Sequence, residues 1–412
     1  MTAADHATRH TAGHSARSWS LGVPPADYVL GHVRAVFADR VVDDARVVVR
    51  DGLIAEAGPH PAGFAADVDG SGLLCLPGLI DTHSDALEKE RVPRPGAELP
   101  LDFALLSLEG KLRAAGITTV FHGAGFQHKT SSGLQRTVST AAALCAAVAD
   151  RAAVAAAPVD HRILYRLDAR SAEGAAALRD QLDPDAGPGT GGAAPLVSHE
   201  DHTPGQGQYV DRRYMERYLR GTAGMTAQDA VTHVDELIEE RDQYLPVLAE
   251  NYAWLGGLAK AGRIRLVGHD PDSPEAIAAL RDRGGSVAEF PTTVPAARAA
   301  RDLGFPVVMG APNVLRGGSH SGNVSAADLV TTGLVTTLAS DYLPSGLLAA
   351  VFTLARSGLL PLPEAISLVT SGPAAVAGLS DRGRLEPGLR ADLTLVEDTG
   401  SWPAVWATLR AA

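Results

Sequence analysis

Histidine and aspartate side chains recur in this sequence directly after short aliphatic runs. The first example is LPGLIDTHSD, residues 76–85, in which an apolar run ends in His83 and Asp85. Side chains alternate along a strand, so these two would point to the same side of it. Imidazoles and carboxylates that converge can bind a divalent cation such as Zn, Mn or Fe. On its own, however, the stretch is more typical of a buried strand that ends in a solvated turn.

Other candidate ligands follow later aliphatic runs, and together they favour a shared metal site. Asp168 ends the run RILYRLD, Asp201 or His202 after PLVSHE offers a further donor, and His269 follows RIRLVG. Asp341 in TTLASDY is left over and suits a general base, because a carboxylate beside an activated water can take its proton. We therefore predict Asp341 as a catalytic residue of a hydrolytic site with the metal ligands His83, Asp85, Asp168, Asp201, His202 and His269.

These side chains can meet only if the runs before them are neighbouring parallel strands. After about residue 76, strand-like runs alternate with alanine-rich helical stretches, which is the pattern of β/α units. Eight runs can be counted, the number that a closed (β/α)8 barrel needs, and in that fold the residues that follow the strands meet at one face. We therefore predict an α/β fold with a TIM-type barrel built on the runs GLIDTH, ITTVFHG, RILYRLDA, PLVSHEDH, RIRLVGHD, GSVAEFP, FPVVMGAP and TTLASDY.

The two ends of the chain have a different texture, with short apolar segments separated by Gly, Asp and Pro. We predict one small β-sandwich from residues 25–75 and 380–412, a flexible leader at 1–24 and the barrel at 76–379. The segment 203–262 follows the fourth strand and is too long for an ordinary loop, so it is predicted to form a lid over the site. The glycine-rich stretch DPDAGPGTGGAAP precedes that strand and is expected at the opposite end of the barrel.

Composition limits the function classes. The 412 residues carry a net charge of −12, which argues against general affinity for nucleic acid or an anionic membrane. The two cysteines form no CxxC motif and the first twenty residues lack the apolar core of a signal peptide, so a reducing cytoplasm is expected. A small molecule is therefore the expected partner, and the sequence leaves open whether the chain forms a homo-oligomer.

Longer motifs resemble one known family, the α-D-ribose 1-methylphosphonate 5-triphosphate diphosphatases of phosphonate breakdown by the carbon–phosphorus lyase pathway, within the amidohydrolase superfamily. The resemblance implies a (β/α)8 barrel with one or two divalent ions, Zn first and Mn or Fe as alternatives. It also implies hydrolysis of a ribose 5-triphosphate to the 5-phosphate with release of pyrophosphate. The shared motifs are LPGLIDTHSD, PRP at 93–95, GITTV, DHTPGQGQY, AEFPTT, MGAPNVLRGGSHSGN and SDYLPSGLL.

A triphosphate needs cations around it, which is demanding for an acidic chain. Arginine suits phosphate because its planar fork donates two parallel hydrogen bonds. Two of the candidates, Arg94 and Arg316, lie inside family motifs. The lid arginines at 212, 213, 217 and 220 fit a solvated helix face equally well. The predicted substrate-binding cations after the strand ends are Lys89, Arg91, Arg94 and Arg316.

The stretch GGSHSGN is predicted to approach the phosphates. Its glycines permit close backbone approach, whereas the alternative is a tight turn before a helix. The family resemblance favours phosphate binding by Ser319 and Asn323, with His320 as a catalytic proton donor or phosphate ligand.

The sequence also departs from the superfamily pattern. Many amidohydrolases carry His-x-His on the first strand and a histidine on the sixth, whereas this chain has His83 with Asp85 and ends its sixth strand in AEFPTT. Asp168 stands where related proteins commonly have Glu. These departures leave the number of metal ions open. The alternatives are an enzyme of this fold that cleaves the C–N bond of an N-acyl or cyclic amide, and a catalytically silent relative that binds phosphonate sugars or scaffolds a complex.

Overall fold

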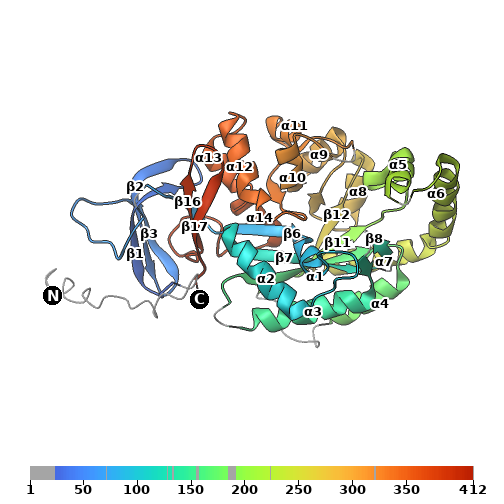
Figure 1. Ribbon diagram of the computed structural model, residues 1–412, viewed down its shortest axis with the longest axis horizontal. Coiled ribbons are helices and arrows are strands. Elements are labelled where there is room, and N and C mark those ends of the chain that lie inside the picture. Colours follow the sequence, from blue (N-terminus) through green and yellow to red (C-terminus); the bar gives the residue numbers. More distant parts are fainter. Residues whose placement is uncertain are drawn as a thin grey trace.

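The structure is a computed structural model that describes residues 24–70, 72–127, 129–131, 134–154, 157–183, 192–222, 224–319 and 322–411. Nearly all of the predicted leader, and also His320, therefore lie outside the described residues. A small sheet occupies one end of the molecule, and a larger barrel with its helices occupies the rest (Figure 1).

Eight parallel strands form the barrel, and they follow one another around it in chain order. Each of the eight predicted runs supplies one strand. The first and last strands meet through a parallel bridge between Ser84 and Asp341, where the Asp341 amide donates to the His83 carbonyl at 2.9 Å. The strands are β6 (Leu79–Ser84), β7 (Ile117–Phe126), β10 (Asp160–Asp168), β11 (Leu196–Glu200), β12 (Arg265–His269), β13 (Val287–Glu289), β14 (Val307–Gly310) and β15 (Thr337–Ala339).

One apolar side chain from every strand fills the barrel interior below the strand ends. Together with residues of α14 (Ser371–Ala377) these side chains form a single buried cluster. Alternation along each strand explains this layer, because every second residue of a barrel strand points inward. The base of the barrel is therefore closed by Ile80, Phe121, Leu164, Leu196, Val267, Val287, Val308 and Ala339.

Helices between the strands pack their alanine- and leucine-rich faces on the outside of the barrel. Several begin at a Ser or Thr whose hydroxyl accepts a hydrogen bond from an amide of the first turn, as Thr137 does from Thr140; each such cap contributes about 1 kcal/mol. The helices of the barrel are α1 (Ala86–Arg91), α2 (Leu101–Ala114), α3 (Val138–Ala152), α4 (Ala172–Gln181), α7 (Leu245–Lys260), α8 (Pro274–Asp282), α9 (Val294–Asp302), α10 (Ala311–Arg316), α11 (Ala326–Thr331), α12 (Gly346–Arg356), α13 (Leu362–Ser367) and α14.

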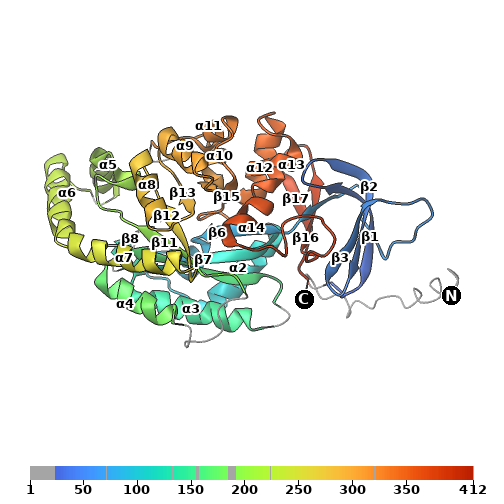
Figure 2. The ribbon, with the colours of Figure 1, turned by 180° about the vertical axis from the view of Figure 1, so that it is seen from behind.

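The predicted lid segment, residues 203–262, begins with a short 3-10 helix at Gly207–Tyr209 and continues as α5 (Arg212–Thr222), α6 (Ala227–Asp242) and α7. Both views place α5 and α6 at the end of the molecule farthest from the small sheet (Figures 1 and 2). A separate two-stranded ribbon, β8 (Lys129–Ser131) and β9 (Leu134–Arg136), follows β7.

Both terminal segments contribute to the small sheet, as predicted. Strand β5 pairs antiparallel with β16 and parallel with β1, so the two segments share one hydrogen-bonded sheet of seven strands. This sheet has its own apolar cluster. Its strands are β1 (Tyr28–Val36), β2 (Val41–Arg50), β3 (Leu53–Pro59), β4 (Val68–Asp69), β5 (Leu74–Pro77), β16 (Leu393–Asp398) and β17 (Pro403–Leu409). Among the described residues, no helix has the length and apolar character needed to cross a membrane.

Candidate functional site

A cavity of about 400 Å³ lies at the carboxyl ends of the barrel strands. Polar side chains from the first, fourth, fifth and eighth strands line it, because each of these strands ends where its last residues turn toward the barrel axis. Those side chains are His83, Asp85, His202, His269, Asp270 and Asp341.

Glu289, the last residue of β13, fixes the orientation of two histidines in this cavity. Its Oε1 lies 2.9 Å from His83 Nδ1 and its Oε2 lies 2.7 Å from His269 Nδ1. Ser198 donates its hydroxyl to Oε2 at 3.1 Å. Because both Nδ1 atoms face the carboxylate, the Nε2 atoms of the two rings are the ones available to a ligand.

The charges around Glu289 keep it ionised. Burial opposes its ionisation, but the charge of His83 and the hydrogen bonds from both imidazoles outweigh burial and hold the Glu289 pKa well below its ordinary value. Burial in turn lowers the pKa of His83, but the Glu289 charge overcomes that effect and raises the pKa to about 10. A metal ion would compete with this proton at Nε2, since metal ligation requires the neutral ring.

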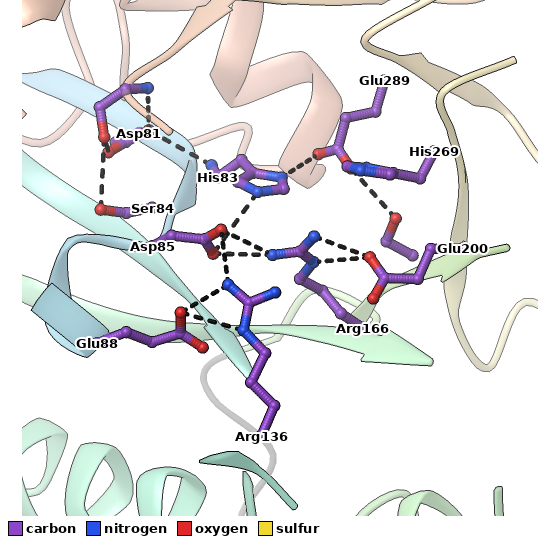
Figure 3. A network of polar contacts seen from close by, with 12 residues as sticks. Asp81, His83, Ser84, Asp85, Glu88, Arg136, Arg166, Glu200, His269 and Glu289 are labelled. Atoms are coloured by element: carbon purple, nitrogen blue, oxygen red, sulfur yellow. Dashed lines mark hydrogen bonds and ion pairs between the residues drawn. The ribbon is translucent and has the colours of Figure 1, made fainter. Parts of the chain in front are cut away.

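Arg166 of β10 lies across the floor of the cavity between two carboxylates (Figure 3). Its Nη1 lies 2.9 Å from both oxygens of Asp85, and its Nη2 donates to Glu200 Oε2 at 2.8 Å. Arg136 extends the network, with a 2.7 Å bond to Glu88 and a 3.8 Å approach to Asp85. The guanidinium groups therefore neutralise most of the negative charge on this side of the cavity.

Gly123 of β7 provides the space for the Asp85–Arg166 pair. A Cβ atom at this position would lie 2.6 Å from Asp85 Oδ1 and 3.3 Å from Arg166 Cδ. Contacts below 3 Å between non-bonded heavy atoms of this kind require a displacement. The glycine in the run ITTVFHG is therefore needed for the ion pair to reach its observed position.

Three buried atoms of residues in the cavity lining or next to Arg166 have no hydrogen-bond partner among the described residues. They are Glu200 Oε1, His202 Nε2 and Asp270 Oδ2. Asp270 Oδ2 lies 3.5 Å from His202 Nε2 and 3.4 Å from His269 Nε2. Buried polar atoms are rarely left unpaired, so this group fits a divalent ion held by oxygen and imidazole nitrogen donors.

Asp341 closes the barrel and also faces the cavity. Its ligand atoms come within 4.8 Å of those of His83 and Asp85. Its backbone is in the left-handed region, with φ of 56°, a conformation that is uncommon outside glycine. Burial, followed by the charge of Asp85, raises the Asp341 pKa to about 6. A carboxyl group with such a pKa is suited to exchanging a proton near neutral pH.

Comparison with known proteins places the chain in a family. It is 33% identical over 376 residues to the α-D-ribose 1-methylphosphonate 5-triphosphate diphosphatase of Escherichia coli, covering 89% of this chain and 94% of that protein. This chain belongs to the α-D-ribose 1-methylphosphonate 5-triphosphate diphosphatase family. A model of the amidohydrolase family also matches residues 285–401. The chain is thus a hydrolase of the amidohydrolase superfamily.

Solved structures of other hydrolases share the fold of this diphosphatase-family chain. An N-acetyl-D-glucosamine-6-phosphate deacetylase of Mycobacterium smegmatis matches with a TM-score of 0.57 at 15% identity, over 94% of this chain and 98% of that one. A β-aspartyl dipeptidase of Fervidobacterium islandicum matches with a TM-score of 0.55 at 14% identity, over 93% and 95%. At these identities the likeness concerns the barrel and its accompanying sheet.

Most of the predicted site residues of this diphosphatase-family chain come together in the cavity, although they start on different strands. The predicted metal ligands Asp168 and Asp201 lie outside its lining. Arg241 of α6 donates to both oxygens of Asp168 at 2.7 and 2.8 Å, and Arg170 donates to Asp201 at 2.8 Å. The predicted residues that line the cavity are His83, Asp85, Lys89, His202, His269, Arg316, Ser319, Asn323 and Asp341.

Two predicted phosphate-binding residues are also remote from the lining. Arg91, the last residue of α1, pairs with Glu98, and Arg94 is exposed just beyond that helix. Lys89, two residues earlier on α1 than Arg91, lines the cavity, whereas Arg91 and Arg94 do not. His320 falls outside the described residues.

Sequence reasoning did not select five residues that shape the site: Glu289, Arg166, Arg136, Asp270 and Glu200. Glu289 ends the sixth strand, where the superfamily pattern predicts a histidine instead. Arg166 lies two residues before Asp168, hence on the same side of its strand, and this alternation was a usable signal. Glu200 directly precedes Asp201 and His202 in SHEDH, and strand direction alone cannot decide among four consecutive polar residues.

Proposed function

We propose that this chain hydrolyses α-D-ribose 1-methylphosphonate 5-triphosphate to the 5-phosphate and pyrophosphate in a divalent-metal-dependent reaction. The observation that carries the proposal is the joint lining of one cavity by metal-type donors and by cations suited to phosphate. The relative from Escherichia coli is named for this reaction, and its alignment covers 89% of this chain. We also propose the cytoplasm as its location, because Cys75 and Cys145 are both free thiols.

A divalent ion would be held foremost by Glu200, His202 and His269. The two histidines line the cavity, and Glu200 is bound to Arg166, which also lines it. When bound, it supplies a Lewis acid that polarises a phosphoryl oxygen and activates water for attack. Zn is our first choice, with Mn and Fe as alternatives, because mixed nitrogen and oxygen donors discriminate poorly among these metals.

Asp341 acts as the general base in this proposal. It lines the same cavity as His202 and His269, and burial with the nearby Asp85 charge raises its pKa to about 6. At neutral pH the carboxylate is therefore ionised and can accept the proton that the attacking water loses. Cleavage of the anhydride linkage between the α- and β-phosphates leaves the 5-phosphate on the sugar and frees pyrophosphate.

The cations in the lining neutralise the polyphosphate. Lys89 places its Nζ 4.3 Å from the centre of the Tyr342 ring, and this stacking holds the ammonium group at the cavity wall. Arg316 stands in the last turn of α10, where its Nε donates to the Pro312 carbonyl at 3.2 Å. Ser319 and Asn323 line the cavity beside it. Such positively charged groups stabilise the charge that develops during phosphoryl transfer.

A product assay tests the proposal. Metal-loaded protein is incubated with the ribosyl phosphonate 5-triphosphate, and pyrophosphate and orthophosphate are measured separately. We expect equal amounts of pyrophosphate and the 5-phosphate. Release of orthophosphate alone would contradict the proposed cleavage position. No phosphate release combined with turnover of N-acyl or cyclic amides would replace it with the C–N hydrolase alternative.

A further inference from the structure

Arg166 separates two of the three groups of candidate metal donors among the described residues. The third, His83, His269 and Glu289, is occupied by the bonds of Glu289 to both Nδ1 atoms. One group consists of His83, Asp85 and Asp341 from the first and eighth strands, and the other of Glu200, His202 and His269 from the fourth and fifth strands. Arg166 bonds to one carboxylate of each group, Asp85 and Glu200 (Figure 3). The number of ions that the site can hold therefore depends on which carboxylate oxygens Arg166 does not bind.

The first group is largely satisfied without an ion. Both oxygens of Asp85 lie 2.9 Å from Arg166 Nη1, and Arg136 approaches Asp85 to 3.8 Å. Arg166 is only 5% exposed, so its charge is poorly screened by solvent. Because both Asp85 oxygens face this buried cation, a divalent ion bound to Asp85 would have to displace Arg166 from it.

The second group keeps its lone pairs. Arg166 contacts only Oε2 of Glu200, and Glu200 Oε1 is buried without a hydrogen-bond partner among the described residues. His202 Nε2 likewise has no hydrogen-bond partner there, and its nearest carboxylate oxygen, Asp270 Oδ2, lies 3.5 Å away. The Arg166 bonds orient the Glu200 carboxylate while leaving its second oxygen open, which is the usual role of a residue that supports a metal ligand.

We infer that the site holds a single divalent ion, at Glu200, His202 and His269, and that Arg166 provides the second positive charge of the centre. This inference rests on the proposed metal-dependent function but not on the identity of the substrate. Arg166 is a positioning residue for Glu200 and a fixed neutralising partner of Asp85. Gly123 is part of the same arrangement, because only a residue without Cβ leaves space for the ion pair.

Metal counting tests the inference without any substrate. Metal-free protein is titrated with Mn²⁺, bound ions are counted by elemental analysis after gel filtration, and electron paramagnetic resonance reports whether bound ions are isolated or magnetically coupled. We expect one isolated Mn²⁺ per chain in the wild type. Two ions per chain, or a coupled signal, would overturn the inference.

Variants of Arg166 test its role as the second cation. Arg166→Met removes the charge and frees Asp85, so we expect the count to rise to two ions per chain. Arg166→Lys retains a positive charge and is expected to stay at one. If the Met variant folds, as judged by circular dichroism, and still binds one ion, Arg166 is not what excludes the second.

Two single-ligand variants keep the inference testable if Arg166→Met does not fold. Glu200→Gln is expected to weaken Mn²⁺ binding more than tenfold, whereas Asp85→Asn is expected to change it less than threefold. The reverse order would place the ion at Asp85 and overturn the inference. A protein with one ion but no pyrophosphate release would contradict only the proposed substrate, and a protein with no bound ion would contradict both proposals.

Discussion

Two cavities at the carboxyl ends of the barrel strands are lined by similar acidic and imidazole side chains. They differ in whether those side chains already have hydrogen-bond or ion-pair partners. In the cavity of about 400 Å³, the buried donor atoms His202 Nε2 and Asp270 Oδ2 have no hydrogen-bond partner among the described residues. The neighbouring cavity of about 520 Å³ is lined by Asp168, whose carboxylate is bound at both oxygens by Arg241. Of these residues, His202 lines both cavities.

The difference lies in the partners and not in the residue types. Asp168 and His269 both end a barrel strand, and both would be chosen as ligands from their position. Helix α6 brings Arg241 over Asp168, and a carboxylate that accepts two charge-assisted bonds has little need of a metal. His269 instead has its Nδ1 side bound to Glu289, which leaves Nε2 facing the first cavity. The position at a strand end is thus necessary for a ligand but not sufficient.

The largest effect is expected from Asp341→Asn. This change removes the proposed base of the first cavity and should lower kcat about 10²–10⁴-fold, while metal content stays close to that of the wild type. Pyrophosphate release and elemental analysis measure the two quantities. Asp328→Asn, in the first turn of α11, is the matched control and should leave both unchanged. A wild-type rate in the Asp341→Asn variant would exclude the base assignment.

A second variant tests whether Glu289 holds the imidazoles of His83 and His269 in the orientation that an ion requires. Glu289→Gln replaces a carboxylate that accepts from two Nδ1 atoms by an amide whose NH₂ group must face one of them. One imidazole should then turn or change its tautomer, and Mn²⁺ affinity should fall about 10–100-fold. Ser198→Ala removes only one hydroxyl bond to the same carboxylate and should have a much smaller effect. Equal affinities in both variants would show that Glu289 does not orient the ligands.

The fold was predictable because its determinants are local. Each run such as RIRLVGHD combines aliphatic residues with a polar end, and the count and order of these runs define the barrel. The strand-end residues His269 and Asp341 could be selected for the same reason. The pairing of Arg166 with Asp85 and Glu200 could not, because it depends on the register of three strands and on the space above Gly123. Asp168 is not available as a metal ligand because it is bound by Arg241, which lies 73 residues away along the chain.

Gly123→Ala tests the close packing below the first cavity. The added Cβ would lie 2.6 Å from Asp85 Oδ1, so the Asp85–Arg166 pair must move. We expect a loss of about 1–3 kcal/mol in the free energy of unfolding, measured by chemical denaturation. Gly110→Ala in α2 is the control, since nothing lies within 4 Å of its added Cβ; there alanine should stabilise the helix by about 0.5–1 kcal/mol. Equal effects at the two positions would argue against a steric role for Gly123.

The smallest effect at the metal centre is expected from Arg241→Ala, which opens the second cavity. Asp168 then loses both charge-assisted bonds, but it keeps access to solvent, so stability should fall by only about 1 kcal/mol. The Mn²⁺ count should not change because, of the two imidazole donors proposed for the ion, only His202 lines the second cavity, and His269 lines the first. Arg212→Ala, which breaks the ion pairs of Arg212 with Glu216 of α5 and Asp235 of α6, provides the control, with a stability change within about 0.5 kcal/mol. An additional ion bound by the Arg241→Ala variant would show that the guanidinium alone separates the two cavities, whereas an unchanged count would show that the imidazole donors of the first cavity are also required.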